Sequence, residues 1–123
     1  MKGLIIKPFW CYKILRDGKV WEIRKTNTNI RGKIFLIASG TKHIVGETEL
    51  INSFPLTKEL FENNFNKHLI NCSYEELPSN YKYVWELSNT KEYNKPKPYK
   101  HKQGAQIWIN LEEEIKWFQN LKN

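Results

Sequence analysis

Hydrophobic and polar residues alternate with a period of two in several short segments, and this alternation predicts β-strands. In the clearest case, Tyr81–Ser88, three aromatic residues and a leucine alternate with Lys, Val, Glu and Ser. Gly32–Ser39 is instead apolar at consecutive positions, as expected of a strand covered on both faces. The other strands predicted from these patterns are Gly3–Lys7, Lys19–Lys25, His43–Ser53 and Ala105–Leu111.

Three segments predict helices. The first begins at Pro8, because a proline at the first helical position loses no hydrogen bond, and apolar residues recur behind it at helical spacing. The second extends from Thr57, as N-cap, to about His68. The third, at about 112–121, has three glutamates near the positive end of the helix dipole and Asn110 as its cap.

Five or six short strands with helices at the ends and in one long connection predict an α+β fold, namely a small mixed β-barrel flanked by short helices. Gly46 inside a predicted strand indicates a bulge or a close approach of another backbone. The chain has 123 residues, enough for one domain with its own core, and no linker or repeat divides it. We therefore expect a single domain over residues 1–123.

The composition excludes several classes of protein. Hydrophobic residues make up 40% of the chain, which is too many for a disordered protein. No apolar stretch approaches the roughly 20 residues of a membrane span, so no membrane partner is expected. Two cysteines, Cys11 and Cys72, do not make a disulfide framework and favour a cytoplasmic location. The net charge of +7 favours phosphate-rich partners, although a lysine-rich surface alone also produces it.

The segment that begins at Lys19 places three charges around two residues of core type. On a strand, Glu22 and Arg24 share one face, and Trp21 and Ile23 share the other. Lys19 stands at the first position, where the preceding turn can direct its ammonium towards a cleft. An exposed ion pair adds only ~0–1 kcal/mol to stability, so folding alone does not require these charges. The spacing by itself leaves open a binding site or an ordinary solvated strand face.

A second basic segment extends from Lys91 to Gly104. Its lysines can neutralise phosphates, and Tyr93 and Tyr99 offer rings on which bases can stack. The alternative is a solvated basic connection between two strands. A smaller candidate is the turn Ser39–Lys42, which could bind a phosphate through its amides and hydroxyls or serve only as a hairpin turn.

The residues needed for metal or nucleotide-cofactor sites are not found in recognisable patterns. His68 and Cys72 lie four positions apart and could share a helix face, but a structural zinc site requires four ligands. The chain contains no P-loop, no dinucleotide fingerprint and no Ser/His/Asp arrangement. The sequence therefore predicts no metal and no cofactor.

The charged segment and three further segments resemble a known family. Lys19, Glu22 and Arg24 match the charged positions of the pattern G-x-K-x-x-E-x-R, while Asp17 stands in place of its glycine, with Gly18 adjacent. On these residues the chain resembles the ASCH domain family of the PUA-like superfamily, over about residues 3 to 111. The further matching segments are Gly3–Trp10, Arg31–Gly40 and Pro98–Trp108.

This resemblance implies a PUA-like β-barrel with a positively charged cleft next to the first helix. The family is associated with RNA metabolism, and its signature residues are thought to line the cleft. One branch consists of acetylcytidine amidohydrolases with a catalytic lysine, and ribonuclease activity is also known. The lysine of that branch corresponds to Lys19 here, but its threonine is replaced by Glu22.

Three functional hypotheses follow. In the first, the protein binds RNA, or a nucleotide or nucleoside, in a basic cleft. In the second, it is a small hydrolase acting on a modified nucleoside or RNA, with Lys19 as base or nucleophile and Glu22 as proton carrier or as the group that orients Lys19. In the third, it is an adaptor that docks through the apolar stripe at 115–121. The residues predicted to line the cleft are Trp10, Lys19, Glu22, Arg24, Ser39, Tyr99, Lys100, His101 and Gln103.

Overall fold

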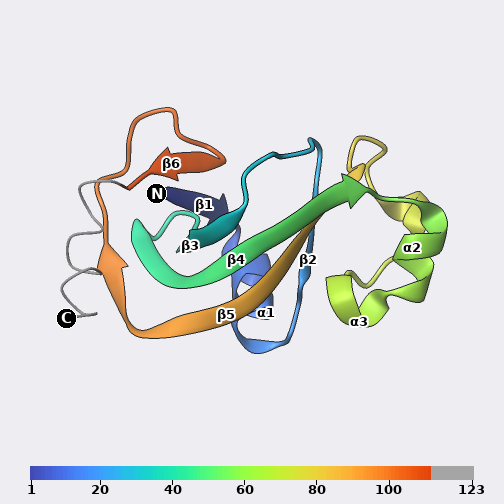
Figure 1. The fold of residues 1–123 in the computed structure, drawn as a ribbon, viewed down its shortest axis with the longest axis horizontal. Helices are drawn as coiled ribbons and strands as arrows, with labels where there is room; N and C mark the ends of the chain where they lie inside the picture. Colours follow the sequence, from blue (N-terminus) through green and yellow to red (C-terminus); the bar gives the residue numbers. More distant parts are fainter. Residues whose placement is uncertain (112–123) are drawn as a thin grey trace.

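The computed structural model of the chain describes residues 1–111, and Figure 1 shows the arrangement of its elements. A short 3₁₀ turn, Tyr74–Glu76, precedes the longest strand. The strands and helices are β1 (Lys2–Ile6), α1 (Pro8–Arg16), β2 (Trp21–Arg24), β3 (Gly32–Ala38), β4 (His43–Pro55), α2 (Lys58–Asn63), α3 (Phe65–His68), β5 (Tyr83–Pro98) and β6 (Trp108–Asn110).

The strands form one mixed sheet of six strands in the order β2-β5-β4-β3-β1-β6. β1 pairs with β3 in parallel, and the other neighbouring strands are antiparallel. β4 and β5 curve along the long axis of the molecule, with α2 and α3 at one end (Figure 1). The predicted α+β class is confirmed. Within residues 1–111 the sheet is not closed into a barrel, because the edge strands β2 and β6 are short and each pairs with one neighbour only.

Three predicted segments differ in extent. The strand predicted over Ala105–Leu111 is only Trp108–Asn110. The basic segment from Lys91, predicted to be an extended segment apart from the strand Tyr81–Ser88, continues β5 as far as Pro98 by pairing with β4. The helix predicted from Thr57 to about His68 is instead two short helices that meet at Asn64. The side-chain amide of Asn64 donates to the Leu60 carbonyl oxygen at 2.8 Å, and such local hydrogen bonds compete with those of a continuous helix.

Other local predictions hold. The Thr57 hydroxyl accepts a hydrogen bond from the Leu60 amide at 3.1 Å, so the predicted N-cap is confirmed. The β4–β5 register shifts between Ile44 and Gly46, as predicted for a bulge. A Cβ atom at Gly46 would collide with the Lys91 carbonyl oxygen, so this position requires glycine. The helix predicted at 112–121, its cap by Asn110 and the apolar stripe within it lie outside the described residues.

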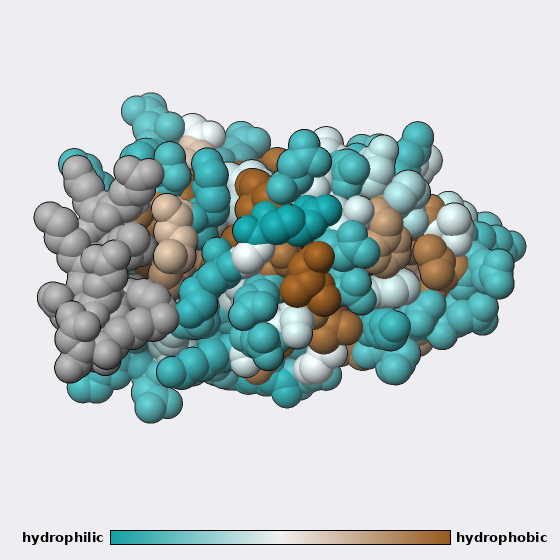
Figure 2. Space-filling view, viewed as in Figure 1, coloured by the Kyte–Doolittle hydropathy of each residue, from teal (hydrophilic) through white to brown (hydrophobic). Residues whose placement is uncertain are grey.

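The core lies in separate layers around the sheet. Cys11 and Ile14 of α1 pack on one face of the sheet, in a cluster that also contains Trp85. Trp21 and Ile23 belong to another cluster, shared with residues at α2. Because successive strand residues point to opposite faces, Glu22 and Arg24 are left on the side nearest α1. Figure 2 shows hydrophilic side chains over most of one face of the molecule, with the hydrophobic ones in small separate groups.

None of the helices among residues 1–111 has the length and apolar character needed to cross a membrane.

Candidate functional site

A cavity of about 760 Å³ opens between the start of α1, the charged face of β2 and the segment that follows α3. Its size is within the roughly 300–1,000 Å³ typical of ligand pockets. Somewhat more than half of its lining residues are apolar or aromatic, and the others are polar or charged. The lining residues are Ile5, Ile6, Lys7, Trp10, Glu22, Ile23, Arg24, Lys25, Thr26, Ser39, Ile70, Cys72, Glu76, Leu77, Pro78, Tyr81, Trp85, Gln106 and Ile107.

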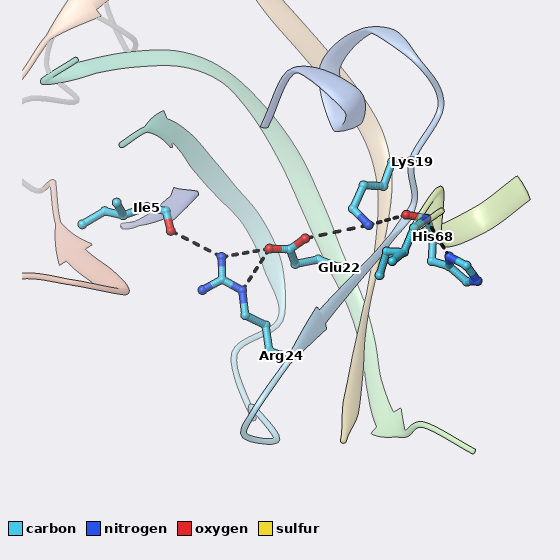
Figure 3. A network of polar contacts seen from close by, with 6 residues as sticks. Ile5, Lys19, Glu22, Arg24 and His68 are labelled. Atoms are coloured by element: carbon cyan, nitrogen blue, oxygen red, sulfur yellow. Dashed lines mark hydrogen bonds and ion pairs between the residues drawn. The ribbon is translucent and has the colours of Figure 1, made fainter. Parts of the chain in front are cut away.

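An ion pair between the buried Glu22 and the partly buried Arg24 forms part of the cavity wall. Glu22 is 6% exposed, and the Arg24 Nε donates a hydrogen bond to its Oε2 at 3.0 Å. A second guanidinium nitrogen of Arg24 donates to the Ile5 carbonyl oxygen at 3.3 Å, which ties the β2 edge strand to β1 (Figure 3). The guanidinium also lies 5.4 Å from the centre of the Trp85 ring. Arg24 is therefore held in place on three sides.

Lys19 lies on the other side of Glu22 and does not line the cavity (Figure 3). Its side chain is 1% exposed, and its Nζ is 4.0 Å from a Glu22 carboxylate oxygen. The same Nζ donates to the His68 carbonyl oxygen at 2.5 Å and lies 4.8 Å from the centre of the Trp10 ring. Gly18, with φ +80°, makes the turn that brings Lys19 from the end of α1 to this position.

Burial lowers the pKa of Lys19 to about 8, because desolvation disfavours the ammonium. The negative charge of Glu22 opposes this shift, and the positive charges of Lys13 and Arg24 reinforce it. With a pKa of about 8, roughly one tenth of Lys19 is unprotonated at pH 7. Lys19 is thus a cation that can also act as a base near neutral pH.

His68 fixes the carbonyl group that receives Lys19. Its Nδ1 accepts a hydrogen bond from the Ile70 amide at 2.9 Å, so the proton of the neutral ring is assigned to Nε2, which donates to the Phe61 carbonyl oxygen at 2.8 Å. The ring stacks on Phe61, and burial lowers the pKa of His68. Both ring nitrogens are therefore occupied.

Among residues 1–111, no three His, Cys, Asp or Glu side chains lie close enough together to hold a metal ion.

The structure brings together only part of the predicted set. Trp10, Glu22, Arg24 and Ser39 line the cavity, with Lys19 directly behind Glu22. The other predicted residues lie elsewhere: Tyr99 and His101 line a second hollow that Ser39 also borders, and Lys100 and Gln103 are exposed and line neither hollow. Tyr99 is 9% exposed within a core cluster, so its ring packs against apolar side chains.

Several lining residues were not predicted from the sequence. Trp85 faces the cavity from β5, where alternation marks it only as a core residue. Ile70 and Cys72 come from the segment after α3, and Gln106 comes from the segment before β6. None of these residues carries a charge or a motif, so only their position in the folded chain identifies them.

The mixed α+β sheet with Lys19, Glu22 and Arg24 beside α1 agrees with the fold expected from the sequence resemblance. The model of the ASCH domain family matches residues 4–97, and the chain belongs to this family. No curated protein matches the chain.

Crystal structures of an ASCH protein from Zymomonas mobilis have the same fold. That protein has a TM-score of 0.71 and 14% sequence identity, over 98% of this chain and 92% of its own. A mutant with tyrosine replaced by phenylalanine has a TM-score of 0.70, 15% identity and coverage of 98% and 95%. A mutant with serine replaced by alanine has a TM-score of 0.67, 16% identity and coverage of 98% and 93%. At these identities the likeness shows the fold alone.

Proposed function

We propose that the protein binds RNA and that the cavity beside α1 receives one unpaired nucleotide. The observation that supports this proposal is the Glu22–Arg24 pair, which is buried, fixed in orientation and part of a cavity wall. A cavity of about 760 Å³ suits a single nucleotide rather than a length of duplex.

The groups in the cavity match the way proteins recognise single-stranded RNA. Unpaired bases stack on aromatic or guanidinium planes and form hydrogen bonds along their edges. Trp10 and Arg24 supply such planes, and Glu22 supplies an acceptor for base N–H groups. Lys7 and Lys25 are exposed at the cavity and supply positive charge for phosphates of the neighbouring nucleotides.

The energetic cost of burying these charges also favours a role in binding. Burying an ion pair often stabilises a protein no more than well-packed apolar residues would. Lys19 and Glu22 are both almost fully buried, although only Glu22 reaches the cavity. We infer that Lys19 balances the charge of Glu22 and positions it, while Glu22 and Arg24 contact the ligand.

Binding to short, dye-labelled single-stranded RNA, measured by fluorescence anisotropy at several salt concentrations, tests this proposal. We expect salt-dependent binding that Arg24→Gln weakens by about tenfold, because a hydrogen-bonded charge is lost from the cavity. Arg31→Gln is the matched control, since Arg31 is exposed and outside the cavity. Binding that does not depend on salt, or equal effects of the two substitutions, would overturn the proposal.

A hydrolase acting on an acylated nucleoside or RNA is the second candidate, favoured by the Lys19 pKa of about 8 next to Glu22. For an amide, the water oxygen would bond to the acyl carbon while a water proton passes through Glu22 to the Lys19 amine. The carbon–nitrogen bond would then break, and the leaving nitrogen would take up a proton.

Incubation with acetylated nucleosides and with RNA oligonucleotides distinguishes the two candidates. Turnover by the parent protein that Lys19→Met abolishes, with the fold retained by circular dichroism, would support the enzyme. RNA binding without turnover of any of these compounds would argue against it.

A further inference from the structure

A second hollow of about 300 Å³ adjoins the cavity. Ile5, Ser39 and Gln106 line both, so the two spaces meet along these side chains. The remaining residues of the second hollow come from the β3–β4 turn and from the segment between β5 and β6. They are Gly40, Lys42, Tyr99, His101 and Ala105. The two spaces are therefore adjacent, and a ligand larger than a base could contact both.

His101 is oriented within this hollow by a buried tyrosine. The Tyr99 hydroxyl lies 2.8 Å from Nδ1 of His101, and burial raises the pKa of Tyr99, so the hydroxyl keeps its proton. We assign this hydroxyl as the donor to Nδ1 of the neutral ring, which places the ring proton on Nε2. In the protonated ring Nε2 also carries a proton. His101 thus offers an N–H donor in both forms.

The β3–β4 turn supplies further donors. Gly40 has φ +84° and Lys42 has φ +58°, with Thr41 between them at negative φ. When left-handed and right-handed backbone conformations alternate in this way, successive N–H groups point to the same side of the chain. They then form a concavity that suits an anion. Within residues 1–111 the amides of Gly40 and Lys42 form no hydrogen bond, and the Lys42 ammonium forms no ion pair.

The charge of the second hollow differs from that of the cavity. No Asp or Glu is among its described lining residues. The cavity carries both signs of charge, because Glu22 and Glu76 line it together with Lys7, Arg24 and Lys25. Lys42 supplies a positive charge, and His101 supplies an N–H donor. A phosphate group therefore meets no carboxylate in the second hollow, whereas in the cavity it would compete with Glu22 and Glu76 for the cations. A simple hairpin turn would explain the residues Ser39–Lys42. It would not explain why His101, from the segment before β6, lines the same hollow as this turn.

We propose that the second hollow is the phosphate subsite of a nucleotide whose base occupies the cavity. This inference rests on the proposed function and narrows the ligand to a phosphorylated nucleotide, either free or within a strand, rather than a nucleoside. Ser39, at the junction of the two spaces, lies where the ribose passes from one to the other.

Isothermal titration calorimetry with the four ribonucleosides, their 5′- and 3′-monophosphates, a short RNA oligonucleotide and inorganic phosphate tests the inference. We expect at least one monophosphate to bind about tenfold more tightly than its nucleoside, as a charge-assisted contact provides. The preferred position of the phosphate shows which end of the nucleotide the subsite receives, and the oligonucleotide shows whether a phosphodiester is accepted.

Three substitutions test the residues. Lys42→Asn removes the charge and keeps a residue that tolerates positive φ, and His101→Phe removes the N–H donor. Both should reduce the preference for monophosphate over nucleoside by about fivefold or more, while nucleoside binding changes little. Lys100→Asn is the matched control, because Lys100 neighbours His101 in sequence but lines neither hollow. It should leave the preference unchanged.

The outcomes separate this inference from the proposed function. If nucleosides and monophosphates bind equally and Arg24→Gln weakens both, RNA binding stands and the phosphate subsite is wrong. Equal effects of Lys42→Asn and Lys100→Asn on the preference would also overturn the subsite. If neither the nucleotides nor the RNA oligonucleotide bind, both proposals fail.

Discussion

Two buried carboxylates in this protein have similar surroundings but differ in access to a ligand. Glu22 on β2 is 6% exposed, and Glu47 on β4 is 9% exposed. Each pairs with a cation at 2.9 Å, Glu22 with Arg24 and Glu47 with Lys33. Judged by burial and ion pairing alone, both would be candidate sites.

The two carboxylates differ in the groups that surround them apart from the paired cation. Glu22 has the buried Lys19 behind it and lines the cavity in front. Glu47 accepts a hydrogen bond from the Tyr93 hydroxyl at 2.8 Å and lines neither hollow. Burial and ion pairing therefore do not by themselves single out Glu22, the proposed binding group, from Glu47. Exposure of the buried pair to a cavity is the distinguishing feature.

The largest expected effect concerns stability. Glu22→Ala leaves Lys19 and Arg24 without their carboxylate in a buried site and should lower the free energy of unfolding by about 3–5 kcal/mol. Glu47→Ala should lower it by about 1 kcal/mol, because Lys33 is 29% exposed and water can replace the lost partner. Urea denaturation measures both. Equal losses of unfolding free energy would contradict this expectation and show that water reaches the cations of both ion pairs equally.

The second prediction concerns Lys19 and pH. The pKa of Lys19 is about 8 in the folded protein and about 10.5 ordinarily, so between these values the unfolded chain binds more protons. The cost of burying the ammonium is complete below pH 8 and disappears as the pH rises to about 10.5. Relative to Lys19→Met, the parent should gain about 3 kcal/mol of stability over this range. A pH-independent difference in denaturation would contradict the lowered pKa.

The third prediction compares ligand binding at the two carboxylates. Glu22→Gln should weaken RNA binding about fivefold, because it removes a charged acceptor from the cavity and loosens Arg24. Glu47→Gln should leave RNA binding within about twofold, since Glu47 lines neither hollow. Anisotropy with labelled RNA measures both variants. A greater loss of RNA affinity from Glu47→Gln than from Glu22→Gln would show that the RNA interface does not include the cavity.

The smallest effect is expected in acid. Burial acts to raise the pKa of Glu47, but hydrogen bonds from Lys33 and Tyr93 outweigh it, so the pKa lies below its ordinary value of 4.5. Ionised Glu47 therefore stabilises the fold above about pH 4.5, and this contribution is lost as the pH falls through the folded-state pKa. The stability advantage of the parent over Glu47→Gln should shrink below that pH in thermal denaturation. An advantage that grows in acid would contradict this assignment.

Features that depend on neighbouring residues were predictable. The strand alternation placed Glu22 and Arg24 on one face and Trp21 and Ile23 on the other, as the ion pair and the core cluster confirm. The cap at Thr57 also follows from local sequence. The ASCH resemblance rested on short segments in a fixed order, and the family match confirms it.

Features that depend on distant contacts were not predictable. The sequence placed Lys19 at a cleft, whereas the structure buries it against the His68 carbonyl, which comes from an element 49 positions away. The basic segment was treated as one candidate surface, but pairing with β4 draws its first part into β5 and leaves His101 at the second hollow. Side-chain periodicity contains no information about such pairings.

The sequence by itself determined which residues are core, where most strands lie, the family, and which three charges are unusual. Backbone preferences and alternation act over a few residues, so they can be read along the chain. Only the tertiary structure decided that Lys19 is buried behind Glu22 instead of lining the cavity with Glu22 and Arg24. The physical reason is that burial and access depend on which distant segments pack together, and here the segments after α3 and before β6 complete the cavity wall.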